Sequence, residues 1–273
     1  MKVQEVIEVL ERLASPSYAM NWDNVGLLAG RRDREVTGIY VGLDATEQVI
    51  EGAVSAGCNM LLTHHPLLFS PVKQVSDSDF VGNRLLTMIE HGISYYAMHT
   101  SYDSAPGCMA DQAAAMLYIE DGEPLELVSG PGEPPCGIGK VGYLAKEITI
   151  DQLCARVKEK FRIPALKVFS AAGTDENGEQ LRDRPLRRIA VSPGSGKSMI
   201  QLAIDAGAQA LVTGDIGHHE GIDGAACGIT VIDAGHYGLE HIFISHVAGY
   251  LREQLGKDVK IVEAEFCMPY RVV

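Results

Sequence analysis

The stretch Leu61-Leu62-Thr63-His64-His65-Pro66 organises the chain, because a short apolar run ends here in two histidines and a proline. An apolar run of this length, bounded by a turn residue, is typical of a buried strand. Side chains alternate along a strand, so His64 and His65 are expected to point to opposite sides, and Pro66 keeps the pair extended. One small ion would hardly be held by both histidines, whereas two neighbouring ions could each take one. The alternative is a pair of structural histidines.

Helical and strand patterns alternate on both sides of this stretch. Helices are predicted over residues 3–14, 44–56, 80–90, 109–117, 149–161, 198–206 and 238–255, and strands over 39–43, 60–65, 93–98, 139–145, 165–171, 188–192, 210–213, 229–232 and 259–262. Asp44 and Glu47 form the expected capping box of the second helix. This alternation indicates an α/β fold with largely parallel sheets.

The chain is expected to form two similar α/β lobes. A stretch rich in Gly, Pro and Glu at residues 122–137 is typical of a linker. It divides the chain into a first lobe, residues 1–128, and a second lobe, residues 129–273. A polar loop is expected at residues 173–185 of the second lobe.

The two lobes resemble each other in sequence. When the second lobe is aligned on the first, similar positions coincide in one block, among them Val41 with Val191, Leu61 with Leu211 and Thr63 with Thr213. In a second block, with a slightly shorter offset, Gly92-Ile93-Ser94 falls on Gly228-Ile229-Thr230. Such matches can arise by chance, but the order of the two blocks favours an internal duplication. Sites in α/β sheets form beyond the carboxyl ends of strands, so two such lobes would bring their polar residues to a cleft between them.

The polar residues at these strand ends are typical metal ligands. They are His64, His65, His99 and Asp103 in the first lobe, and Asp215, His236 and Glu240 in the second. His236 and Glu240 are four residues apart at a helix start and therefore share one face. The carboxylate of Glu240 could bridge two ions, which would polarise a substrate oxygen and lower the pKa of a bound water. A nitrogen and oxygen ligand set without sulfur suits two divalent ions per chain, of zinc, iron, manganese or cobalt.

Two other motifs lie near the ends of predicted strands. The stretch Ser192-Pro193-Gly194-Ser195-Gly196-Lys197-Ser198 resembles a phosphate-binding loop, but Val191 stands where that motif requires its first glycine. A plain turn is the preferred interpretation, and anion binding stays open. The pair His218-His219 could support the site or lie in solvent.

Composition narrows the class of protein. A net charge of −13 argues against a nucleic-acid-binding surface and favours attraction of cations. Six scattered cysteines without a C-x-x-C pair indicate reduced thiols in a cytoplasmic protein. Residues 1–13 form a charged amphipathic pattern and not a signal peptide, and no apolar run approaches about 18 residues. No membrane partner is expected.

With these motifs in place, the chain resembles a known family, the GTP cyclohydrolase 1 type 2 homologues, also called dinuclear metal centre hexameric proteins. The resemblance is carried by Trp22-Asp23-Asn24-Val25-Gly26-Leu27, Thr63-His64-His65-Pro66, His99-Thr100-Ser101-Tyr102-Asp103, Ala105-Pro106-Gly107, Val212-Thr213-Gly214-Asp215 and His236-Tyr237-Gly238-Leu239-Glu240. It implies that His65 and Asp103 hold one ion, that His64 and His236 hold the other, and that Glu240 bridges them. It also implies a toroidal hexamer with the metal sites facing its inner cavity.

The chain departs from the family pattern in two places. The family usually has His-Thr-Asn-Leu-Asp where this chain has His99-Thr100-Ser101-Tyr102-Asp103, so a different wall is expected beside the site. Longer relatives carry an inserted domain near the linker, and residues 122–137 are too few to hold one.

Two main functions fit these residues. The first is a metal-dependent hydrolase for a small nucleotide-like, phosphorylated or amide-bearing substrate, with His99 or His219 relaying a proton. The second is a non-catalytic protein that stores, delivers or senses metal, or a ring-shaped scaffold for a partner. The family name contains a GTP cyclohydrolase activity, which is an expectation from the resemblance and not from the residues of this chain.

Overall fold

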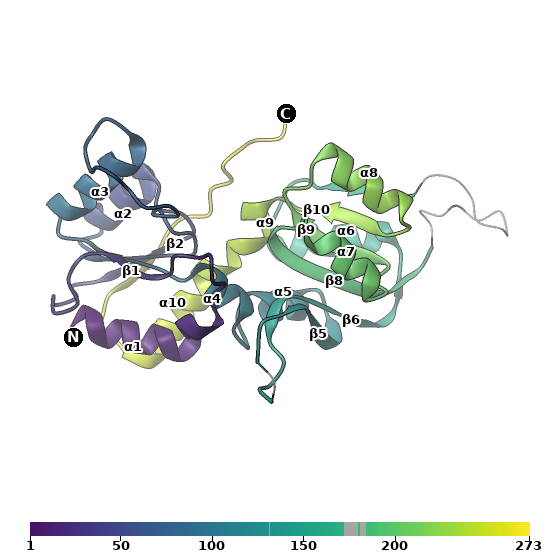
Figure 1. Ribbon diagram of the computed structural model, residues 1–273, viewed down its shortest axis with the longest axis horizontal. Helices are drawn as coiled ribbons and strands as arrows, with labels where there is room; N and C mark the ends of the chain where they lie inside the picture. Colours follow the sequence, from purple (N-terminus) through teal and green to yellow (C-terminus); the bar gives the residue numbers. More distant parts are fainter. Residues whose placement is uncertain (131, 172–179, 181–183) are drawn as a thin grey trace. The chain divides into compact units, whose positions relative to one another are not determined.

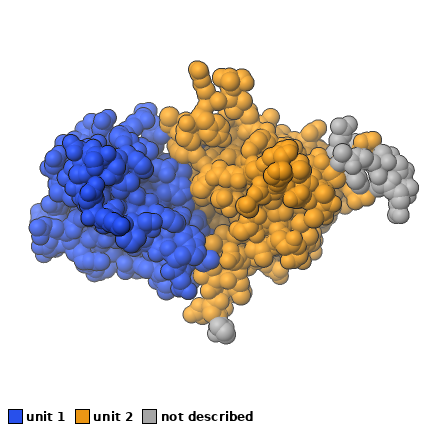
Figure 2. Space-filling view, turned by 45° about the horizontal axis from the view of Figure 1, so that its top comes forward, with its two compact units in different colours: residues 1–105, 243–266 blue, residues 106–242, 267–273 orange. Residues whose placement is uncertain are grey.

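The computed structural model describes residues 1–130, 132–171, 180 and 184–273. Its internal contacts divide the chain into two compact units, coloured separately in Figure 2. Unit 1 comprises residues 1–105 and 243–266, and unit 2 comprises residues 106–242 and 267–273. The expected lobes, residues 1–128 and 129–273, follow other limits and stay a prediction of how the chain folds. Most of the polar loop expected at residues 173–185 lies outside the described residues.

Unit 1 is a five-stranded sheet with helices (Figure 1). Its elements are α1 (Val3–Leu13), η1 (Pro16–Tyr18), β1 (Gly26–Ala29), β2 (Ile39–Gly42), α2 (Glu47–Ser55), β3 (Met60–Thr63), α3 (Phe80–Glu90), β4 (Ser94–Ala97), α4 (His99–Ser104), α10 (Ile242–Leu255) and β11 (Ile261–Glu263). The strand order is β1-β4-β3-β2-β11. Only β1 runs antiparallel to its neighbour, so this sheet is largely parallel as predicted.

Unit 2 contains a six-stranded mixed sheet. Its elements are α5 (Met109–Met116), β5 (Ile119–Leu127), β6 (Gly137–Ile148), α6 (Ile150–Phe161), β7 (Lys167–Phe169), β8 (Leu186–Ser195), α7 (Met199–Asp205), β9 (Ala210–Gly214), α8 (His218–Ala226), β10 (Thr230–Asp233) and α9 (His236–Glu240). The order is β5-β6-β8-β9-β10-β7, with parallel pairing confined to β8, β9 and β10. The predicted linker at residues 122–137 is wrong, because its ends belong to the antiparallel pair β5 and β6.

The register of the strands supports the duplication. In β2 and β3, Ile39 pairs with Met60, and at the matching positions of β8 and β9, Ile189 pairs with Ala210. In β3 and β4, Thr63 pairs with Ala97, just as Thr213 pairs with Asp233 in β9 and β10. The three central parallel strands therefore have the same order and register in both units.

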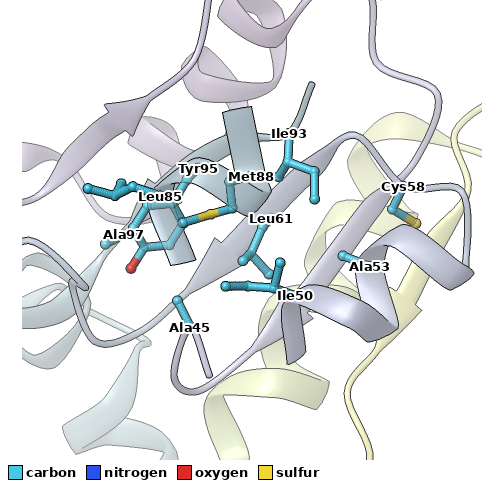
Figure 3. Packing of buried hydrophobic residues seen from close by; sticks show 10 residues of the cluster. All are labelled: Ala45, Ile50, Ala53, Cys58, Leu61, Leu85, Met88, Ile93, Tyr95 and Ala97. Carbon is cyan, nitrogen blue, oxygen red and sulfur yellow. The ribbon is translucent and has the colours of Figure 1, made fainter. Parts of the chain in front are cut away.

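The core of unit 1 fixes the strand that leads to the histidines. Leu61 of β3 is fully buried among side chains of α2, α3 and β4 (Figure 3). The neighbours drawn there include Ile50 from α2, Met88 from α3 and Tyr95 from β4. Burying one leucine of this kind contributes about 1.5–3 kcal/mol, so the end of β3 has a well-defined position.

The ends of two helices differ from those predicted from the sequence. The predicted capping box at Asp44 is wrong, because Thr46 is the N-cap of α2 and its side chain accepts a hydrogen bond from the Val49 backbone. The predicted long helix over residues 238–255 is two helices, α9 and α10, that meet at His241. Within the described residues, no helix combines the length and hydrophobicity needed to cross a membrane.

Candidate metal centre

The turn that carries the first two predicted ligands is fixed by buried hydroxyl groups. Strand β3 ends at Thr63, and the Thr63 hydroxyl donates to the His65 carbonyl over 2.7 Å. The Tyr95 hydroxyl donates to the same carbonyl and accepts from the Leu67 backbone amide. Burial raises the pKa of Tyr95 to about 12, so its proton stays available for this bond. The turn is therefore tied to the centre of the sheet.

The two histidines lie beside each other beyond the strand. Their ring centroids are 4.7 Å apart, so the expectation that strand alternation separates His64 and His65 is wrong. His64 is fully buried, and its Nε2 lies 3.5 Å from a carboxylate oxygen of Asp103. His65 is partly exposed, and its Nδ1 lies 2.8 Å from a carboxylate oxygen of Asp44. The structure thus brings His64, His65 and Asp103 together within unit 1.

Helix α4 supplies both His99 and Asp103. The two residues are four apart and therefore share a helix face. The His99 ring lies 5.5 Å from the His64 ring and 5.6 Å from the His65 ring. The backbone of His99 has a φ of +31°, a left-handed conformation that non-glycine residues rarely adopt and that often marks functional sites. His99 is therefore held in strained geometry directly beside the paired histidines.

Asp23 holds His99 in this position. Its carboxylate lies 2.7 Å from His99 Nδ1 and accepts hydrogen bonds from the Thr100 backbone and hydroxyl. Burial of Asp23 acts to raise its pKa, but the hydrogen bonds from His99 and Thr100 outweigh it and lower the pKa to about 2. Asp23 is thus a carboxylate at neutral pH and directs the Nε2 of His99 away from itself.

Tyr102 is one of the departures from the family pattern, and it lies against the buried histidine. Its ring stands edge-on to His64 at 6.2 Å and to Phe243 at 4.9 Å. Its hydroxyl lies 2.6 Å from Nδ1 of His246 on α10. Burial lowers the pKa of His246, which favours a neutral ring there. The altered wall is a packed aromatic layer of unit 1.

In unit 2, helix α9 carries the remaining predicted ligands. His236 opens the helix and Glu240 ends it, with His236 Nε2 and a Glu240 oxygen 3.0 Å apart. The Glu240 side chain is almost fully buried. A Cβ added to Gly194 of β8 would lie 2.5 Å from Glu240 Oε1, so the absence of a side chain there makes room for the carboxylate. Gly194 therefore leaves room for the candidate ligand Glu240.

Two acidic residues position His236. The Asp215 carboxylate lies 2.8 Å from His236 Nδ1, and Asp215 has a φ of +57° at the end of β9. The buried carboxylate of Asp233 accepts hydrogen bonds from the Ile216 and Gly235 backbone amides. Asp233 thereby ties together the two loops that carry Asp215 and His236.

Three histidines of the candidate centre share one arrangement. His65, His99 and His236 each place Nδ1 against a carboxylate, so each presents Nε2 to its other side. Metal-binding histidines commonly have such a carboxylate partner, which fixes the tautomer and makes the ligand nitrogen more basic. Sequence reasoning missed this role for Asp44 and Asp23. Asp44 directly precedes a helix, which favours a capping role in the sequence, and Asp23 is far along the chain from the histidine it holds.

His219 is placed differently from the other candidates. It is exposed on α8 of unit 2, with its ring against the neighbouring His218 at 5.2 Å. On the same helix, Glu220 pairs with Lys197 over 2.6 Å. The lysine of the glycine-rich turn is therefore engaged by a carboxylate.

Among the described residues, His64 and His65 of unit 1 and Glu240 of unit 2 each offer an atom that could hold a metal ion. All three are ligand types that bind zinc and other divalent transition metals. Imidazole nitrogen and carboxylate oxygen are suitable ligands for such an ion. The side chains of His64 and Glu240 are buried.

Comparisons with known proteins show which proteins this chain is similar to. The family model DUF34/NIF3 (NGG1p interacting factor 3) matches residues 1–267. A Clostridium perfringens protein named GTP cyclohydrolase 1 type 2 homolog is 30% identical over 274 residues, covering all of both chains. A Clostridium acetobutylicum protein of the same name is 33% identical over 240 residues, which is 88% of this chain and 85% of that protein.

A solved structure shares the fold. The Bacillus cereus protein related to NIF3 matches with a TM-score of 0.90 at 22% identity, covering 100% of this chain and 99% of that one. Together with the sequence matches, this agrees with the family resemblance predicted from the motifs. The chain belongs to the DUF34/NIF3 family.

Proposed function

We propose that this protein binds two divalent metal ions per chain and uses them to hydrolyse a small substrate. In this proposal His65 and Asp103 hold one ion, His64 and His236 hold the other, and Glu240 bridges the two. Zinc, iron, manganese and cobalt all suit this ligand set. The observation that carries the proposal is the Nδ1–carboxylate pairing of His65 and His236 at 2.8 Å each, which presents both Nε2 atoms as ligands.

Chain connectivity supports a joint site. The Phe243 ring packs against the His64 ring at 5.2 Å inside unit 1. Glu240 precedes Phe243 by three residues, and three residues span at most about 11 Å. The short connection thus limits how far the backbone of Glu240 can lie from Phe243. The same short connection tethers His236, whose Nε2 lies 3.0 Å from Glu240.

The residues of this chain divide the work of hydrolysis between them. Two divalent ions, when bound, polarise the scissile group and lower the pKa of water. His99 then moves a proton at Nε2, because Asp23 holds its Nδ1 and its ring lies beside His64 and His65. His219 is the weaker candidate for this role, since its exposed ring lies against His218 on α8. The substrate class is a small nucleotide-like, phosphorylated or amide-bearing molecule.

The decisive experiment is a substrate screen with metal-loaded protein. Phosphoesters, nucleotides and amides are tested with the natural protein, with Glu240→Gln as the blank and Glu253→Gln, an exposed position on α10, as the matched control. Turnover by the natural protein and the control, lost in Glu240→Gln, is the expected result. Two bound ions without turnover of any compound would favour the metal-handling alternative.

A second measurement links the metals to folding. Ions that bind only the folded state add to its stability, so a chelator is expected to lower the melting temperature of the natural protein. The shift should be smaller for Glu240→Gln, which has less metal to lose. Family resemblance further leads us to propose a homo-oligomer, a hexamer by analogy, whose mass light scattering would measure. We also propose a cytoplasmic location.

A further inference from the structure

Two large aromatic side chains of unit 1 are exposed next to the candidate site. Trp22 is 57% exposed and Phe69 is 53% exposed. Their ring centroids are 5.8 Å apart, with the ring planes tilted by 42°. Aromatic side chains usually bury most of their surface, so an exposed pair in contact calls for an explanation.

Hydrogen bonds hold this aromatic pair in place. Asp23, which follows Trp22, is fixed by His99 and Thr100 of α4. The Asn24 side-chain amide donates to the Leu68 carbonyl over 2.5 Å and so joins the two segments that carry the rings. The pair is therefore preorganised by its neighbours, as a binding surface for a rigid ligand requires.

His99 connects the aromatic pair to the paired histidines. Its ring is edge-on to Trp22 at 5.9 Å and to Phe69 at 6.0 Å. The same ring lies 5.5 Å from His64 and 5.6 Å from His65. A group resting on the aromatic pair would thus lie about one side chain away from the candidate ligands.

We propose that Trp22 and Phe69 form a subsite for a planar heteroaromatic ring of the substrate. The assignment of that ring to a substrate rests on the proposed hydrolase function, whereas the ring-binding surface itself does not. Stacking on aromatic side chains accepts any flat ring, and His99 would then stand between the bound ring and the reacting group. The substrate class narrows to molecules that join a heterocycle to a hydrolysable group.

The size of the surface favours a small molecule over a protein. Half-exposed Trp and Phe side chains together offer roughly 200 Å². A stable protein interface needs about 800 Å² from each partner. A single heterocycle can be covered by two rings of this size.

Trp22 is the only tryptophan of the chain, so its fluorescence reports directly on this surface. The probes are adenosine 5′-monophosphate and ribose 5-phosphate, which differ by the purine ring. With zinc-loaded protein, the purine compound is expected to quench Trp22 and bind at least about 10-fold more tightly than ribose 5-phosphate. Equal affinities would overturn the subsite.

The variants separate stacking from other effects. Phe69→Leu is expected to weaken binding of the purine compound by roughly 5–100-fold and to leave ribose 5-phosphate unchanged. Phe80→Leu, another exposed aromatic of unit 1, is the matched control and should change neither. By calorimetry, Trp22→Leu should lose the purine preference and Trp22→Phe should keep most of it. Equal weakening of both probes in Phe69→Leu would contradict the proposal.

Metal content and mass are measured on the same samples. Two ions per chain without a purine preference would reject the subsite and leave the hydrolase proposal standing. A purine preference in protein that binds no metal would reject the hydrolase proposal and leave the subsite standing. Loss of the natural oligomer in Phe69→Leu, without any purine preference in the natural protein, would show that the aromatic pair joins copies of the chain and would overturn the subsite.

Discussion

The ends of the central strands in unit 1 and unit 2 share a backbone plan but carry different chemistry. Strands β2, β3 and β4 have the same order and register as β8, β9 and β10. Yet in the alignment that places Thr63 on Thr213, His64 and His65 correspond to Gly214 and Asp215. Unit 1 thus supplies paired imidazoles from the strand end, whereas unit 2 supplies an imidazole and a buried carboxylate from α9. The matching strands of the two units are therefore followed by different types of metal-binding side chain.

The two regions also fix their loops differently. In unit 1 the neutral hydroxyl of Tyr95 holds the turn that carries the histidines. In unit 2 the buried carboxylate of Asp233 holds the loops that carry Asp215 and His236. Both regions nevertheless place a non-glycine residue in left-handed backbone, His99 in one and Asp215 in the other. Local strain thus occurs in both regions at residues tied to the candidate centre.

The largest expected effect comes from the ligand assigned to both ions. Glu240→Gln should lower the occupancy of both metal positions, with an affinity loss of at least about 100-fold, whereas His64→Ala should mainly empty one. Without a shared anion, two cations in a low-dielectric site also repel each other more strongly. Elemental analysis after equilibration with zinc measures the metal content of Glu240→Gln and His64→Ala, with Glu253→Gln as the control. Full metal content in Glu240→Gln would contradict the proposal that Glu240 bridges the two ions.

The next largest effect on metal binding is expected from the carboxylates that orient a histidine in each unit. Asp44→Asn and Asp215→Asn should each weaken metal binding by about 10–100-fold, because each releases the Nδ1 of one candidate ligand. Competition with a metal-binding dye measures the loss, with exposed Asp258→Asn as the control. An effect confined to one of the two variants would mean that only the histidine oriented by that carboxylate, His65 or His236, binds metal.

A smaller effect concerns the Asp23–His99 pair of unit 1. Unit 2 has no equivalent histidine, because His99 falls on Gly235 in the alignment that places Gly92 on Gly228. The pKa of Asp23 falls from 3.8 to about 2 on folding, so its carboxylate stabilises the folded state above about pH 4 by roughly 2 kcal/mol. That contribution is lost as the pH falls from about 4 to 2. Asp23→Asn should therefore be less stable at neutral pH, and the difference should shrink in acid.

Urea unfolding of both proteins between pH 7 and pH 2 measures this difference. The exposed control Asp258→Asn should stay within about 0.5 kcal/mol of the natural protein at neutral pH. A stability difference between Asp23→Asn and the natural protein that is the same at every pH would contradict the assigned charge of Asp23.

The smallest expected effect on stability comes from the N-terminal caps of two corresponding helices, α2 in unit 1 and α7 in unit 2. Thr46 caps α2 through its side chain, whereas Ser198 makes no side-chain cap bond at α7. Thr46→Ala should cost about 1 kcal/mol of unfolding free energy, and Ser198→Ala should cost less than about 0.5 kcal/mol. Thermal or urea unfolding measures both, and equal losses would contradict the assigned caps.

Much of the fold could be predicted from sequence periodicity. The apolar runs placed β3 and β9, and the sequence match between the two halves of the chain anticipated the shared register of their sheets. The pairing of β5 with β6 could not be predicted, because glycine and proline occur both in linkers and in hairpins. The antiparallel β7 and β6 likewise depend on contacts with strands distant in sequence.

The candidate site was predictable at the level of ligand types. The strand ends and the helix spacing point to His64, His65 and Glu240, and each of them offers a ligand atom of a type that could hold a metal ion. The orientation of His64 and His65 could not be predicted, since β3 ends at Thr63, before the two histidines to which the alternation rule was applied. The support from Asp44 and Asp23 also escaped prediction, because each acts on a histidine distant in sequence.

Anomalous diffraction from crystals of the zinc-loaded protein tests the central claim most directly. The account predicts two zinc peaks per chain, about 3.5–4 Å apart, with Glu240 coordinating both. His65 and Asp103 should coordinate one ion, and His64 and His236 the other. A single peak, or two peaks that Glu240 does not join, would contradict the proposed division of ligands between the two units.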